Sequence, residues 1–187
     1  MHAQTQQQLQ DAFSNSYTLE SEKKYGEAIN QLSVVYSESS YEINLRLGWL
    51  HYLNTDYSSA ATFYQRSINL MPAATEPLWG ITQVYAAQNN WIKLEKAYKS
   101  IIELDSKNSI AHYWLGMIFY NRKDYTSAKR YLDVSLNLNP FDYDVLLLSA
   151  WTNYFLGNTN EAKILFNKTL LNHPNDQSAL EGLSLIK

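Results

Sequence analysis

The sequence contains no cysteine, which excludes disulfide bonds, thiolate metal sites and a cysteine nucleophile. It has only 6 glycines and 4 prolines in 187 residues, which argues against a disordered or loop-rich chain. No apolar run is long enough to span a bilayer as a helix, so membrane insertion is not expected. The net charge of −3 provides no basic field for nucleic acid, and nucleic-acid binding is not expected either.

Apolar and aromatic residues are plentiful. The composition is 45% hydrophobic and 14% aromatic, with 15 tyrosines against 6 phenylalanines and 5 tryptophans. A chain of this length and composition is sufficient for one globular domain or one short repeat array.

The first residues suggest how the chain begins. Met1-His2-Ala3 followed by Gln4 resembles the end of a signal peptide, with Ala3 as the small residue before the cut and Met1 supplied for expression. The charged and apolar regions of such a peptide are absent, and an ordinary cytoplasmic start is the alternative. Export is the interpretation favoured here.

The stretch from Ser109 to Pro140 is the unit that the chain repeats. Its apolar and small residues recur at i, i+3, i+4 and i+7, which predicts two amphipathic helices joined by a polar turn at Asn121–Asp124. Pro140 ends the second helix because proline cannot continue it. The helix-face residues are His112, Leu115, Gly116 and Phe119, then Ala128, Leu132, Ser135 and Leu136.

From Tyr41 onward the period is 34 residues. Four sets of positions repeat at this spacing: Ala60, Leu94, Ala128 and Ala162; Tyr64, Tyr98, Leu132 and Phe166; Pro72, Ser106, Pro140 and Pro174; and Tyr57, Trp91, Tyr125 and Thr159. The small residues are expected where two helices approach closely, and the large ones where neighbouring repeats meet. Turns are predicted near Asn54–Asp56, Gln88–Asn90, Asn121–Asp124 and Gly157–Thr159.

The repeat unit resembles a tetratricopeptide repeat, whose signature is W-x2-L-G-x2-Y, then A-x3-F, then P. Leu115–Gly116, Phe119, Ala128 and Pro140 match, whereas His112 replaces the tryptophan and Leu132 the phenylalanine. The resemblance implies an all-α, right-handed α-solenoid of about five helix-turn-helix repeats with a C-terminal capping helix. The expected boundaries are a flexible N-terminus over 1–8 and a single array over 9–187, with repeats at about 9–40, 41–74, 75–108, 109–142 and 143–176 and a cap over 177–187.

The resemblance also implies a binding site. In this family one face of the first helices lines a concave groove that holds a peptide or a partner helix. The positions that match are Phe13, Tyr17, Arg46, Trp49, Tyr52, Trp79, Gln83, Tyr113, Trp114, Met117, Tyr120, Leu148, Trp151, Tyr154 and Phe155. Trp91 instead begins a second helix, where we expect it to be buried between helices.

Several explanations of this aromatic face remain open. The rings could be ordinary core, but a contiguous open aromatic patch of this extent needs a cover. We favour a protein or peptide partner as the cover. Alternatively, a second copy of the chain or its own N-terminus covers the patch, and the protein is then a self-assembling structural module. Small-ligand or glycan binding on the aromatic rings is a further alternative.

No catalytic, cofactor-binding or metal-binding constellation is apparent, so we expect a non-enzymatic protein. There is no glycine-rich phosphate loop and no His-Glu-x-x-His motif. His51 and His112 fall at core-facing positions. In the family's carboxylate clamp, basic residues grip a C-terminus, but only Arg46 is basic at the matching places here. We therefore expect apolar and aromatic contacts to dominate binding, and Arg46 to matter little unless the ligand carries a carboxylate.

Overall fold

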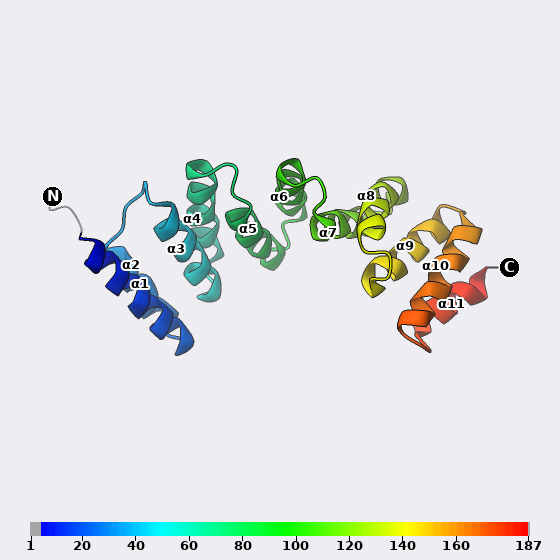
Figure 1. Cartoon of the computed structure of the whole chain (residues 1–187), viewed down its shortest axis with the longest axis horizontal. Coiled ribbons are helices and arrows are strands. Elements are labelled where there is room, and N and C mark those ends of the chain that lie inside the picture. The colour runs from blue at the N-terminus through cyan, green and yellow to red at the C-terminus, as the bar shows by residue number, and fades with distance from the viewer. Residues whose placement is uncertain (1–4, 187) are drawn as a thin grey trace. The chain divides into compact units, whose positions relative to one another are not determined.

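The computed structural model describes residues 5–186, and this part of the chain forms eleven helices and no strand (Figure 1). The predicted all-α fold is confirmed. The helices are α1 (Gln6–Ser21), α2 (Tyr25–Val34), α3 (Tyr41–Leu53), α4 (Tyr57–Leu70), α5 (Glu76–Ala87), α6 (Trp91–Leu104), α7 (Ser109–Asn121), α8 (Tyr125–Leu138), α9 (Tyr143–Phe155), α10 (Thr159–Asn172) and α11 (Gln177–Leu185). Odd-numbered helices are called first helices below, and even-numbered ones second helices.

Side-chain caps define where many helices begin. Ser40, Asn108 and Asp142 accept a backbone N–H at the starts of α3, α7 and α9. Three further caps, which we call the N-cap aspartates, are Asp56, Asp124 and Asp176 on α4, α8 and α11. Hydrogen bonds to the carboxylate lower the pKa of all three, chiefly from Ser59, Ser127 and Tyr143 respectively.

Helix α1 begins at Gln6, within the segment over 1–8 that was expected to be flexible. Thr5 and Gln8 form a capping box: Thr5 Oγ1 accepts from the Gln8 N–H at 3.2 Å, and Gln8 Oε1 accepts from the Thr5 N–H at 2.9 Å. Residues 5–8 therefore form the start of the helix. Residues 1–4, which carry the export interpretation, lie outside the described residues.

Each turn from a first helix to its second helix contains one residue with positive φ. These residues are Lys23, Thr55, Asn89, Lys123 and Gly157, with φ between 53° and 77°. The left-handed residue lets the chain reverse and return an N–H to the helix end; Asp56 N–H, for example, donates to His51 O at 2.9 Å. All four predicted turns are found. Only Gly157 adopts this conformation without a Cβ penalty.

The chain divides into two compact units, Met1–Ala97 (the N-terminal unit) and Tyr98–Lys187 (the C-terminal unit), and the boundary falls inside α6. Each unit has its own apolar core. One core of the N-terminal unit centres on Leu32 and Leu47, and that of the C-terminal unit on Leu146 and Phe166.

Glycines mark the closest approaches between helices. A Cβ on Gly116 would lie 2.6 Å from Leu132 Cγ, as expected for a small residue that brings α7 against α8. Gly80 was not expected to have this role. A Cβ there would lie 2.3 Å from the ring of Tyr64, which reaches from α4 onto both Gly48 of α3 and Gly80 of α5.

Trp91 is not buried between helices, contrary to expectation, and 50% of its surface is exposed. The equivalent residues Tyr57 and Tyr125 each pack on a tyrosine at the end of the preceding helix, with ring centroids 5.9 and 5.6 Å apart. In the third repeat that position holds Ala86, so Trp91 has no ring there to pack against.

Candidate functional site

Successive first helices contact one another within each unit: α3 contacts α5 in the N-terminal unit, and α9 contacts both α7 and α11 in the C-terminal unit. Their side chains form two groups. The N-terminal face comprises Phe13, Tyr17, Arg46, Trp49, Tyr52, Trp79 and Gln83, and the C-terminal face comprises Tyr113, Trp114, Met117, Tyr120, Leu148, Trp151, Tyr154 and Phe155.

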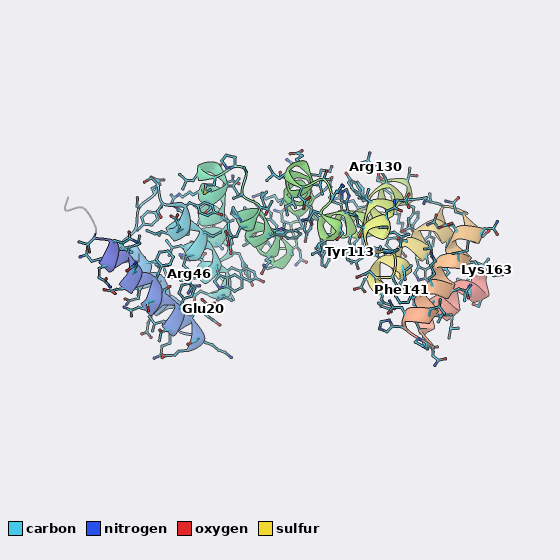
Figure 2. The ribbon with its side chains drawn as sticks, viewed as in Figure 1. Glu20, Arg46, Tyr113, Arg130, Phe141 and Lys163 are labelled. Atoms are coloured by element: carbon cyan, nitrogen blue, oxygen red, sulfur yellow. The ribbon has the colours of Figure 1, made fainter. Side chains whose placement is uncertain are left out.

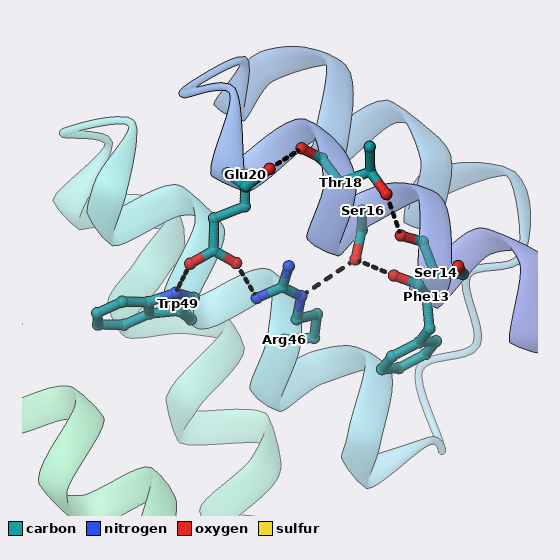
Figure 3. A network of polar contacts seen from close by, with 8 residues as sticks. Phe13, Ser14, Ser16, Thr18, Glu20, Arg46 and Trp49 are labelled. Carbon is teal, nitrogen blue, oxygen red and sulfur yellow. Dashed lines mark hydrogen bonds and ion pairs between the residues drawn. The ribbon is translucent and has the colours of Figure 1, made fainter.

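Arg46 is at the centre of a polar network on the N-terminal face (Figure 3). Its Nη1 forms an ion pair with Glu20, and its Nε donates to Ser16 Oγ at 3.1 Å. Its guanidinium carbon lies 3.9 Å from the ring centroid of Tyr17. The second oxygen of Glu20 accepts from Trp49 Nε1 at 2.7 Å. The network therefore links α1 to α3 through three polar contacts.

These contacts give Arg46 a structural role that the sequence did not indicate. Its side chain is only 7% exposed, and its Nη2 is buried without a hydrogen-bond partner. Because its charge is already matched by Glu20, Arg46 is not a free cation that awaits a carboxylate. It holds helices together, and a buried ion pair is costly to break from one side. Glu20 precedes Arg46 by 26 residues, so no local sequence pattern indicated the pair.

The other rings of the N-terminal face partly cover one another. Trp49 and Tyr52 stack with centroids 5.7 Å apart, and Tyr52 also contacts Tyr57. Phe13, Trp49, Tyr52 and Trp79 are half-buried, whereas Gln83 is exposed. Tyr17 remains 56% exposed, with its ring lying over the Arg46 guanidinium.

Five rings form a continuous cluster on the C-terminal face. Phe155 stacks on Tyr125 at 4.7 Å and on Trp151 at 6.0 Å, and its centroid is also 6.0 Å from that of Tyr120. Tyr154 packs edge-on against Trp151 at 5.6 Å. Tyr125 comes from the second helix α8 and was not among the predicted face residues, although the aromatic set Tyr57, Trp91 and Tyr125 was a signal for it. Phe155 is 46% exposed.

Trp114 lies farther along the C-terminal face. Its ring is parallel to that of Tyr98, with centroids 6.3 Å apart and planes 4° from parallel, and Tyr113 packs edge-on against it. Trp114 is 36% exposed. Met117 and Leu148 are half-buried.

A small hollow of about 110 Å³ lies beside Tyr113, the α7 residue labelled in Figure 2. Ile110, Asp142 and Asp144 also line it, together with Ser109, Ser135, Asn139 and Val145. Burial raises the pKa of Tyr113 to about 12, and the nearby carboxylates of Asp144 and Asp142 contribute. The hollow is thus negatively charged.

Both predicted core histidines form hydrogen bonds within the chain. His112 Nε2 hydrogen-bonds to Ser106 O at 3.0 Å, and His51 Nδ1 to Asp56 Oδ2 at 3.1 Å, whereas His112 Nδ1 is buried without a hydrogen-bond partner. Within residues 5–186, no three His, Asp or Glu side chains are grouped so that they could hold a metal ion. None of the helices described is long and apolar enough to cross a membrane.

Comparison with known proteins relates this geometry to one family. The tetratricopeptide repeat family matches residues 84–143 and again residues 144–176. No curated protein sequence matches the chain.

Solved structures share the fold at low sequence identity. A tetratricopeptide repeat protein from Parabacteroides merdae ATCC 43184 is 18% identical, with a TM-score of 0.79 over 95% of this chain and 72% of its own. The MamA protein is 14% identical, with a TM-score of 0.77 over 90% of this chain and 93% of its own. YrrB, described as a tetratricopeptide repeat protein with an unusual peptide-binding site, is 14% identical, with a TM-score of 0.74 over 93% of this chain and 91% of its own. The 34-residue period, the paired helices and both family matches agree with this shared fold, and the chain is a tetratricopeptide repeat protein.

Proposed function

We propose that this protein is a non-enzymatic interaction scaffold that holds an apolar, aromatic or amphipathic segment of another protein on its first-helix faces. The observation that carries the proposal is the exposure of large rings on these faces. Tyr17, Trp114 and Phe155 are 56%, 36% and 46% exposed, although each already packs against a neighbouring side chain.

The chemistry of these rings suits protein recognition. Tyrosine and tryptophan bring a large apolar area together with one polar tip, so they can bury surface and still fix the orientation of a bound segment. Covering apolar surface contributes about 25 cal/mol for each Å² removed from water. The peptide-binding site named for YrrB gives this proposal support by analogy of fold alone.

Two tryptophans in different places provide a test. Trp114 is on the C-terminal face, whereas Trp91 is on a second helix and is similarly exposed. The wild-type chain, Trp114→Ala and Trp91→Ala would be used to capture partners from an extract of the source organism, with quantification by mass spectrometry. Titration calorimetry would then measure the affinity of the captured partner.

We expect Trp114→Ala to lose the partner, because truncating a central aromatic anchor typically costs 2 kcal/mol or more of binding, about thirtyfold. Trp91→Ala should retain it. Equal capture by all three proteins would contradict the proposed role of the face. Melting curves of each variant separate a loss of binding from a loss of folding.

Self-association is a second candidate, because the last described helix, α11, exposes Leu180 and Leu185. A second copy could cover these side chains. Size-exclusion chromatography with light scattering tests this, with Leu180→Glu as the disrupting variant. A monomer at high protein concentration would remove this candidate and leave the scaffold proposal in place.

A further inference from the structure

Basic residues are absent from nearly all first helices. Helices α1, α5, α7, α9 and α11 contain no lysine or arginine, and α3 contains only Arg46. Arg46 is buried and paired with Glu20, so it contributes no free positive charge. Within residues 5–186, all other lysines and arginines lie on second helices or in the connections.

Carboxylates are distributed differently. Glu42, Glu76 and Asp144 occupy the same position of the 34-residue period, in the first turns of α3, α5 and α9, and all three are exposed. Asp142 lies beside Asp144 at the start of α9, and both line the hollow next to Tyr113. The first helices therefore present aromatic surface with negative charge only.

We propose that the segment bound by the C-terminal face is basic, with lysine or arginine side chains spaced among apolar residues. This inference rests on the proposed function. The apolar residues of the segment pack on Trp114 and Phe155, and one cation occupies the hollow between Tyr113 and Asp144. Opposite charges at the rim of an interface accelerate association and select the partner. A partly exposed tryptophan ring adds a cation–π attraction for the same side chains.

An acidic segment would be rejected by the same surface. Its carboxylates would face Asp142 and Asp144 with no lysine or arginine on α7 or α9 to balance them. Like charges brought together at an interface oppose binding. The charge expected for the bound segment is thus opposite to that of an acidic C-terminal tail, which basic side chains would hold.

The test begins with a phage library of random 15-residue peptides, selected on the immobilised full chain. We expect the enriched peptides to combine aromatic or aliphatic residues with a net positive charge. Fluorescence anisotropy with one enriched peptide then measures the dissociation constant for the wild type and three variants. The dissociation constant should rise with salt because the charged contacts are exposed to solvent.

The variants separate a local charge effect from net charge. Asp144→Lys and Glu161→Lys change the net charge equally, and both residues are exposed in the first turn of a helix, but Glu161 is on second helix α10. We expect Asp144→Lys to raise the dissociation constant by about twofold to fivefold, the range for loss of an exposed ion pair, and Glu161→Lys to leave it unchanged. Trp114→Ala should abolish binding.

Different failures identify different errors. If the enriched peptides are acidic or uncharged, or if both charge reversals weaken binding equally, the inference about a basic partner is wrong; the proposed function stands provided that Trp114→Ala still abolishes binding. If no peptide is enriched, or if binding ignores Trp114→Ala, the proposed function itself fails, and the inference fails with it.

Discussion

Gly80 offers a stringent test of the packing between helices α4 and α5. The ring of Tyr64 is only 3% exposed and occupies the space where a Gly80 side chain would be, so an added Cβ would lie 2.3 Å from two ring carbons and 2.8 Å from the hydroxyl oxygen. Because the ring is enclosed and rigid, Gly80→Ala must displace either Tyr64 or the helix. Overpacking of this kind costs about 1–3 kcal/mol.

Gly26→Ala is the matched control, since Gly26 is also within a helix but has no atom within 4 Å of its would-be Cβ. Gly80→Ala gains helix propensity of about 1 kcal/mol in a helix interior, and Gly26→Ala, in the first turn of α2, gains no more than this. The difference between the two variants in unfolding free energy is therefore a lower limit on the steric cost. Urea unfolding followed by circular dichroism measures it, and we expect Gly80→Ala to be about 1–3 kcal/mol less stable than Gly26→Ala.

A second-site change tests the cause. One residue equivalent to Tyr64 in the C-terminal unit is Leu132, and the position equivalent to Gly80 there holds the larger residue Leu148. In a Tyr64→Leu background the space beside Gly80 should open, and Gly80→Ala should then cost nothing or stabilise. If Gly80→Ala is as stable as Gly26→Ala, or if Tyr64→Leu does not relieve it, the proposed contact does not exist in solution.

Three further predictions follow from the same contacts. Glu20→Leu should destabilise the protein by about 3 kcal/mol because it leaves the Arg46 guanidinium buried and unpaired. Arg46→Met should cost less, and a double-mutant cycle measured by urea unfolding checks which of the two variants loses more stability. The N-cap aspartates have lowered pKa values, so the stability they provide is present above their ordinary pKa and is lost as the pH falls through the folded-state value. The unfolding free energy should therefore drop below about pH 4, and a variant with asparagine at all three caps should show a flatter profile, which unfolding curves at successive pH values would reveal. Trp91→Ala should lower the unfolding free energy by only about 1–2 kcal/mol, since half of the side chain is already in water; a loss twice as large would mean that it is buried in solution.

Much of the fold could be predicted from the sequence because its signals are local. The 34-residue period predicted the helix pairs and the turns, and the small residue at Gly116 predicted a close approach that the structure contains. The cap of α1 is equally local, since Thr5 and Gln8 have the spacing of a capping box. Whether the predicted face residues bind a partner remains a prediction.

Only the tertiary structure decided the burial and the partners of side chains that are surrounded by other helices. The resemblance predicted that Arg46 faces the groove, yet Glu20 and Tyr17 of α1 contact its guanidinium here. Trp91 belongs to an aromatic set but is exposed, because the ring on which its equivalents pack is replaced by Ala86. Periodicity specifies which side of a helix a residue occupies, whereas burial depends on the size and charge of residues that are distant in sequence and adjacent in space.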